Sequence, residues 1–297
     1  NKVHVVYGHG GETVKKALEQ IDAVWIEQKQ QLGTGHAVQQ AIHHVEDADT
    51  VLILYGDVPL LKVETLQSLL RDVSGSSLAL LTVILDDPTG YGRIIRDNQN
   101  NVVRIVEQKD ASPEQLAIKE GNTGILACKG DQLKNWISRL SNNNAQNEYY
   151  LTDIIEMAVQ DGLTVKTTQT KSQDEVLGVN NRNQLAHLER VYQMQQAEYL
   201  MTQGVTLRDP ARIDVRGHFI ELGQDIEVDV NVIFEGQNSI GSNVKIGANC
   251  ILKHVVIADD VEILPNSLLE YARVGAGSRI GPFARLRPET NIAEHVH

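Results

Sequence analysis

The sequence is poor in residues that build several common kinds of site. Aromatic residues make up 4% of the chain, so a stacking platform for nucleic-acid bases is not expected. The two cysteines, Cys128 and Cys250, lack metal-ligand spacing and predict free thiols, which favours the cytoplasm. No apolar run reaches the roughly 18 residues of a membrane-spanning helix. The net charge of −12 argues against binding to nucleic acid or a membrane surface in general.

The first stretch that indicates function is the apolar run 51–54, followed by Tyr55, Gly56 and Asp57. Such a run bounded by turn residues predicts a parallel strand covered on both faces. Asp57 would lie past the carboxyl end of this strand, where open α/β sheets bind ligands. A carboxylate there could hold Mg²⁺ against substrate phosphates. An aspartate that merely satisfies loop amides is the equal alternative.

The first half of the chain alternates between strand and helix patterns. Apolar strands are expected at 78–85, 122–128, 165–168 and 175–179, with a hairpin around 98–101. Helices are expected between them, including one at 148–160, and a long one at 181–203. This alternation predicts an α/β, Rossmann-like domain with a mostly parallel sheet.

The second half has a different period. Apolar residues recur every six positions, with two slips of one residue, at Val228, Phe234, Ile240, Ile246, Leu252, Ile257, Ile263, Leu269, Val274, Ile280, Leu286 and Ile292. A six-residue period is typical of a hexapeptide β-helix, in which each apolar side chain points into a narrow prism. A β-sandwich with chance spacing is the weaker alternative.

Longer motifs carry a resemblance to the sugar-nucleotidyltransferases, and within them to the bifunctional GlmU family. This family combines N-acetylglucosamine-1-phosphate uridyltransferase with glucosamine-1-phosphate acetyltransferase. The motifs span the whole chain and lie at residues 30–37 (QQLGTGHA), 54–60 (LYGDVPL), 87–94 (DPTGYGRI), 106–111 (VEQKDA), 122–124 (NTG), 142–150 (NNNAQNEYY), 178–182 (GVNNR), 207–212 (LRDPAR) and 281–288 (GPFARLRP). One departure is Glu289, where the family pattern has glycine.

The resemblance implies roles for individual residues. Uracil and ribose would meet Gln28, Gly33 and Thr34, and the nucleotide site would be lined by Tyr55, Gly56 and Asp57. The N-acetylhexosamine would contact Gly92, Glu107 and Asn122. Asp57 and Asn180 would be the protein ligands of Mg²⁺, and Arg287 would contact the acyl acceptor. Taken alone, each has a plainer interpretation: the 28–34 loop as a turn, Glu107 as a solvated strand residue, Asn180 as a helix cap, Arg287 as a corner residue.

The function implied by the resemblance is Mg²⁺-dependent transfer of UMP from UTP to N-acetylglucosamine 1-phosphate. The products would be UDP-N-acetylglucosamine, a precursor of peptidoglycan and lipopolysaccharide, and pyrophosphate. The full family also uses acetyl-CoA as co-substrate and forms homotrimers. Two alternatives stay open: a nucleotidyltransferase for another sugar 1-phosphate, and a non-catalytic regulatory or assembly subunit.

The implied domains are a uridyltransferase domain over 1–182, a helical linker over 183–203 and an incomplete β-helix, left-handed in this family, over 204–297. The family's opening Gly-rich loop, with its catalytic Arg and Lys, has no match here. Neither does the acetyltransferase His. We therefore expect a chain truncated at both ends, impaired in both activities, and name no catalytic residue.

Overall fold

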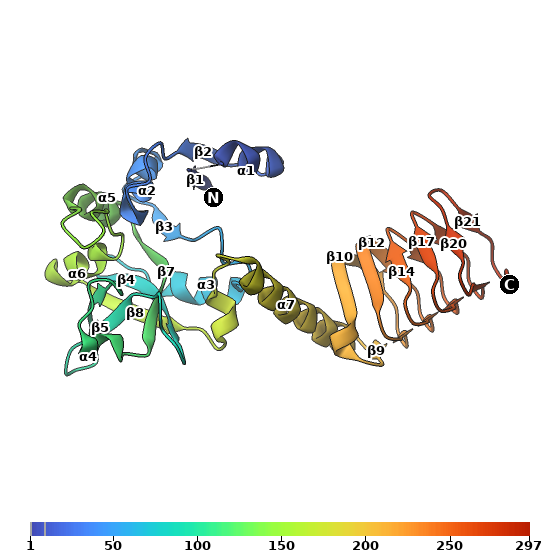
Figure 1. Cartoon of the computed structure of the whole chain (residues 1–297). Coiled ribbons are helices and arrows are strands. Elements are labelled where there is room, and N and C mark those ends of the chain that lie inside the picture. The colour runs from blue at the N-terminus through green and yellow to red at the C-terminus, as the bar shows by residue number, and fades with distance from the viewer. Residues whose placement is uncertain (1, 9) are drawn as a thin grey trace. The chain divides into compact units, whose positions relative to one another are not determined.

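The computed structural model describes residues 2–8 and 10–297 and divides into two compact units, Asn1–Asn180 and Asn181–His297. The first unit is α/β and the second is a parallel β-helix preceded by one long helix (Figure 1). Among the described residues, no helix combines the length and apolar character needed to span a membrane.

The first unit alternates strands and helices, as the sequence predicts. In chain order its elements are β1 (His4–Tyr7), α1 (Gly11–Ala17), β2 (Val24–Glu27), α2 (Thr34–Ala41), η1 (Ile42–His44), β3 (Thr50–Ile53), α3 (Val63–Arg71), β4 (Ser77–Ile84), β5 (Arg93–Arg96), β6 (Val102–Val106), α4 (Pro113–Leu116), β7 (Glu120–Lys129), α5 (Gly130–Arg139), α6 (Asp153–Gln160), β8 (Thr164–Gln169) and η2 (Gln173–Val176).

Strand directions in this unit follow the prediction, but strand neighbours do not. β3, β4, β5 and β8 run in one direction, and β6 and β7 run in the other. The helix α3 connects β3 to β4, yet β7 lies between them and pairs antiparallel with both. The six-stranded sheet is therefore mixed, with β4–β8 as its parallel pair among the described residues. The position of β7 between β3 and β4 depends on contacts between residues far apart in the sequence, which local periodicity does not indicate.

The strand before Asp57 also differs from its prediction. β3 pairs antiparallel with β7, and its apolar side chains are half-buried rather than enclosed on both faces. The two strands that precede it in the chain, β1 and β2, pair parallel with each other in a separate two-stranded sheet. β3 therefore has fewer neighbouring strands than a strand in the centre of a sheet.

The fully enclosed strand is β4, which packs a core on each face of the sheet. Leu78 and Leu80 belong to the core formed with α5 and α6, while Ala79 and Leu81 belong to the core that includes Leu69 of α3. All four side chains are completely buried. Successive residues of a strand point to opposite faces, so an unbroken apolar run marks a strand covered on both sides.

The second unit begins with α7 (Arg182–Thr202), whose first turn is capped by the Asn181 side chain accepting from Gln184 N. Its short strands are β9 (Thr206–Leu207), β10 (Ile213–Leu222), β11 (Glu227–Val228), β12 (Val232–Ile240), β13 (Lys245–Ile246), β14 (Ile251–Lys253), β15 (Val256–Ile257), β16 (Glu262–Ile263), β17 (Leu268–Glu270), β18 (Arg273–Val274), β19 (Arg279–Ile280), β20 (Arg285–Leu286) and β21 (Asn291–Ile292), with η3 (Pro210–Arg212) between β9 and β10.

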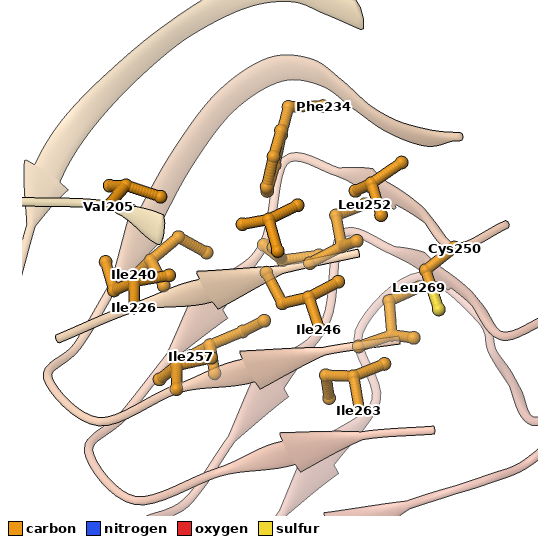
Figure 2. Close-up of a cluster of buried hydrophobic side chains, with 14 of the residues drawn as sticks. Val205, Ile226, Phe234, Ile240, Ile246, Cys250, Leu252, Ile257, Ile263 and Leu269 are labelled. Atoms are coloured by element: carbon orange, nitrogen blue, oxygen red, sulfur yellow. The ribbon is translucent and has the colours of Figure 1, made fainter. Parts of the chain in front are cut away.

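These strands stack coil on coil (Figure 1). Their parallel pairings form three ladders. The twelve predicted apolar positions form three columns inside the prism. The columns are Val228, Ile246, Ile263 and Ile280; Phe234, Leu252, Leu269 and Leu286; and Ile240, Ile257, Val274 and Ile292. All belong to one core, with Leu286 and Ile292 partly buried (Figure 2). The hexapeptide prediction is confirmed, and the fold is the left-handed hexapeptide type.

Residues with positive φ mark the corners of the prism. One corner column holds Asn231, Asn249 and Asn266, with φ of 61°, 60° and 62°. Their side chains form a ladder, with Nδ2–Oδ1 distances of 2.9 and 3.2 Å between coils. Asparagine tolerates the left-handed region better than most residues, so it suits these turns.

Two further elements differ from the sequence prediction. Residues 175–179, expected as a strand, form the end of η2 and an extended segment after it. The helix expected from residue 148 begins at Asp153. In both places the local apolar pattern predicts the wrong conformation, because tertiary contacts decide the backbone conformation there.

Candidate functional site

Three strands bring Gly92, Glu107 and Asn122 together. Gly92 precedes β5, Glu107 follows β6, and Asn122 lies in β7. The Asn122 N–H donates to Gly92 O at 2.8 Å, and a Cβ on Gly92 would lie 3.4 Å from Glu107 Oε2. The Asn122 side-chain oxygen accepts from Gly124 N at 3.0 Å. A carboxylate, an amide and a buried glycine thus meet at one place.

Glu107 is part of a group of carboxylates. The Thr152 hydroxyl donates to Glu107 Oε1 at 2.9 Å, while burial raises the pKa of Glu107 and the nearby Asp110 adds to this. Burial also raises the pKa of Asp153 to about 6, with Glu107 as the strongest of its acidic neighbours. A partly desolvated carboxylate that accepts from a hydroxyl is suited to binding further hydroxyls, such as those of a sugar.

Tyr55 links this group to the second helix. Its ring lies against Gly124, where φ is 79° and any Cβ would overlap the ring. Its side chain hydrogen-bonds that of Thr34, the first residue of α2. Burial raises the pKa of Tyr55, and the charges of Glu107 and Asp57 raise it further. The phenol therefore stays protonated at neutral pH.

Asp57 lies in the turn after β3, exposed to solvent. Its carbonyl oxygen accepts from Val179 N at 2.9 Å, and a Cβ on Gly178 would lie 3.2 Å from its Oδ2. These contacts bring the segment that carries Asn180 alongside the Asp57 turn. Burial raises the pKa of Tyr91, and the negative charge of Asp57 raises it further.

The loop predicted to meet the base is held by the protein's own contacts. The Gln28 amide nitrogen donates to Gly33 O at 3.1 Å. Gly33 has a φ of 108°, and a Cβ there would lie 2.6 Å from Tyr149 O. Thr34 Oγ1 accepts from Leu151 N at 3.2 Å. The glycine is therefore required by close packing of the 149–151 segment, whatever the loop binds.

Comparison with known proteins agrees with this geometry. Residues 1–96 match the family described as the MobA-like NTP transferase domain. The chain is 60% identical over 293 residues to the bifunctional protein GlmU of Methylococcus capsulatus, and 56% identical over 295 residues to that of Marinobacter nauticus. Each match covers 99% of this chain and 64–65% of the relative. Over nearly all of its residues, this chain is thus similar to part of the bifunctional GlmU proteins.

The chain thus spans about two thirds of the length of these GlmU relatives, 64% in the first case. A weaker likeness exists to a solved nucleotidyl transferase of Methanothermobacter thermautotroptrophicus, with a TM-score of 0.42 and 16% identity. That match covers 63% of this chain and 71% of the other.

Mg²⁺ fits the residues that the GlmU resemblance assigns to it. A carboxylate and an amide oxygen are hard ligands, and Mg²⁺ is usually held by one or two protein oxygens together with substrate phosphates. The described residues contain no group of three His, Cys, Asp or Glu arranged for a metal ion. A site that shares its cation with a phosphate substrate needs no such group.

Arg287 belongs to the second unit and has none of the residues above near it in sequence. Its side chain is exposed, and its carbonyl oxygen accepts from Thr290 N and Oγ1 at 3.1 and 2.7 Å. Glu270 on the neighbouring coil forms its ion pair with Arg285, at 3.7 Å. Arg287 therefore also fits the plainer interpretation of an exposed corner residue.

Four residues of this GlmU-type site were missed from the sequence: Tyr91, Asp110, Thr152 and Asp153. Tyr150 also reaches Asp110, with its hydroxyl donating to Oδ2 at 3.3 Å. Tyr91 lies inside the 87–94 motif and Asp110 inside the 106–111 motif, so both could have been found there. Thr152 and Asp153 lie at the start of α6, and nothing local relates them to Glu107.

Proposed function

We propose that the first unit binds UTP and N-acetylglucosamine 1-phosphate for Mg²⁺-dependent uridyl transfer, giving UDP-N-acetylglucosamine and pyrophosphate. The observation that carries the proposal is the convergence of Gly92, Glu107 and Asn122 beside the turn of Asp57. The first three residues suit a neutral sugar, and the Asp57 turn suits a cation with phosphates. A sugar nucleotide has both parts.

The chemistry is an in-line displacement. An oxygen of the sugar 1-phosphate attacks the α-phosphorus of UTP, the new P–O bond forms, and pyrophosphate leaves with the electrons of the broken bond. Positioning and electrostatic stabilisation account for most catalysis of this type, so no protein nucleophile is required. Bound Mg²⁺ would supply positive charge to the phosphate oxygens.

The chain's own residues would orient the two substrates. Asp57 and Asn180 would hold the cation, while Glu107 and Asn122 would bind sugar hydroxyl and N-acetyl groups. Gln28, Gly33 and Thr34 would meet uracil and ribose, with Tyr55 and Gly56 lining the nucleotide. Gly92, which has no side chain, would meet the sugar through its backbone.

For the whole protein we propose the second GlmU activity as well: acetylation of glucosamine 1-phosphate from acetyl-CoA, with Arg287 contacting the acceptor. We further propose a uridyltransferase domain over 1–182, a helical linker over 183–203 and a β-helix domain over 204–297. A cytoplasmic homotrimer that supplies precursors for peptidoglycan and lipopolysaccharide completes the proposal. The names of the relatives support it, because they are bifunctional GlmU proteins.

The test is Asp57→Ala in the full-length protein, with pyrophosphate release measured from UTP and N-acetylglucosamine 1-phosphate at several Mg²⁺ concentrations. We expect Asp57→Ala to abolish Mg²⁺-dependent turnover, because the variant lacks the charged ligand. Asn180→Ala should reduce turnover less. Undiminished activity in Asp57→Ala would contradict the metal assignment.

The same assay separates the alternatives. Preference for glucose 1-phosphate over N-acetylglucosamine 1-phosphate would favour a different sugar-nucleotidyltransferase. Saturable binding of uridine nucleotide without pyrophosphate release, for any sugar phosphate, would favour a non-catalytic module.

A further inference from the structure

Arg93 is a buried cation with an unusual set of partners. It is the first residue of β5 and 2% exposed. Its Nη1 donates to Tyr91 O, and its Nη2 donates to Gln108 Oε1 at 3.2 Å. Nε has no partner, and no carboxylate forms an ion pair with Arg93 in the described part of the chain. The guanidinium thus donates to neutral acceptors only, although Asp87 of the same loop is near enough to interact with its charge.

Such an arrangement is poor for stability alone. Removing a charged side chain from water costs several kcal/mol unless it is paired, and an apolar residue of similar volume often serves a core as well or better. The remaining reason for an arginine here is geometric. A planar guanidinium can donate to two separate acceptors in fixed directions, which a lysine ammonium cannot reproduce.

Both acceptors are connected to the loop that leads into the sugar side of the site. Tyr91 O is part of this loop, residues 87–92. Gln108 Oε1 also accepts from Gly90 N at 2.6 Å, so it joins the loop to Arg93. The turn itself is closed by Tyr91 N donating to Pro88 O at 3.1 Å. Arg93 therefore holds the loop twice, directly at Tyr91 and through Gln108 at Gly90.

The held loop ends at Gly92, which lies against Glu107 on the sugar side of the site. A Cβ on Gly92 would lie 3.4 Å from Glu107 Oε2. We propose that Arg93 is a positioning residue that fixes Tyr91 and Gly92, and so sets the affinity of the site for the sugar part of a sugar nucleotide. This rests on the proposed function, in which Gly92 and Glu107 contact the N-acetylhexosamine.

The experiment compares two ligands by isothermal titration calorimetry: UDP-N-acetylglucosamine, which fills both halves of the site, and UDP, which lacks the sugar. Arg93→Lys keeps the charge but loses the fork. We expect it to raise the Kd for UDP-N-acetylglucosamine about tenfold and the Kd for UDP less than about twofold. Gln108→Ala should act in the same direction. The double variant should lose no more affinity for UDP-N-acetylglucosamine than the weaker-binding single variant, because both substitutions release the same loop.

Arg96→Lys is the matched control. Arg96 lies in the same strand and makes a two-pronged ion pair with Glu120, with distances of 2.8 and 2.7 Å, but does not hold the 87–92 loop. It should leave the ratio of the two Kd values unchanged. The inference would be overturned if Arg93→Lys and Gln108→Ala weakened binding of both ligands equally. It would also be overturned if they changed neither Kd. Failure of the unmodified chain to bind either ligand would instead contradict the proposed function.

Discussion

At the scale of single residues, two glycines beside the nucleotide site differ in a way that separates folding from binding. A Cβ at Gly124 would overlap the Tyr55 ring, and its φ is 79°. At Gly56 a Cβ would meet no atom within 4 Å. We expect Gly124→Ala to lower the free energy of unfolding by roughly 2 kcal/mol, and Gly56→Ala to change it by less than about 0.5 kcal/mol.

Urea unfolding of both variants and titration with UDP measure the two effects separately. If Gly56 faces the nucleotide, as proposed, Gly56→Ala should weaken UDP binding while its unfolding curve stays unchanged. Normal UDP binding by Gly56→Ala would remove Gly56 from the site.

Asp153 gives a prediction about pH. Its pKa is raised to about 6, by burial first and then by Glu107 and other carboxylates. It is the first residue of α6, where the helix dipole favours a carboxylate, but burial and like charges outweigh this. A folded-state pKa above the unfolded value means that the native state binds the extra proton. The contribution to stability is therefore present near pH 4 and is lost as the pH rises through 6.

Asp153→Asn should remove this dependence. We expect the variant to be more stable than the unmodified chain at pH 8, by roughly 1 kcal/mol after solvent screening is allowed for, and about equal near pH 4. Urea unfolding midpoints at the two pH values measure the difference. A variant destabilised at pH 8 would show that ionised Asp153 makes favourable contacts in the fold.

At the scale of elements, the corners of the β-helix decide which residues each coil tolerates. One corner column consists of Gly236, His254, Tyr271 and Glu289, all with positive φ. His254 and Tyr271 stack with ring centroids 4.6 Å apart, and a Cβ on Gly236 would collide with the His254 ring. The column thus changes from glycine to aromatic to charged residues along the prism.

Glu289 occupies this corner with a φ of 68°, where the family pattern has glycine. A non-glycine residue in the left-handed region costs about 1 kcal/mol, so Glu289→Gly should stabilise the second unit by about that amount. Glu289→Ala is the control, because it removes the charge and keeps the strained backbone. Equal stabilisation by both variants in urea unfolding would attribute the effect to charge.

Elements with one strong local pattern could be predicted from sequence, and those decided by distant contacts could not. The six-residue period specified twelve inward positions because each coil repeats one local unit. The same reasoning failed for β3, because β7 pairs with it from some seventy residues later. The resemblance predicts Gly92, Glu107 and Asn122 as site residues, but no local pattern predicts that they lie together. They lie together because β5 pairs with both β6 and β7. Thr152 and Asp153 of the α6 region then lie near Glu107.

At the scale of the whole molecule, the flat ladders of the β-helix predict assembly. A prism face offers an extended surface, and the proposed homotrimer would pack three such faces. We expect light scattering to give a mass three times the 32.9 kDa of the chain, falling toward the monomer on dilution. A monomer at all concentrations would contradict the homotrimer.

We propose that one site in the first unit holds both parts of UDP-N-acetylglucosamine. A crystal structure of the chain with this ligand and Mg²⁺ tests this. We expect the N-acetylhexosamine to lie against Gly92, Glu107 and Asn122, with the diphosphate beside Asp57. A sugar ring bound away from these three residues, with the uridine in place, would contradict it.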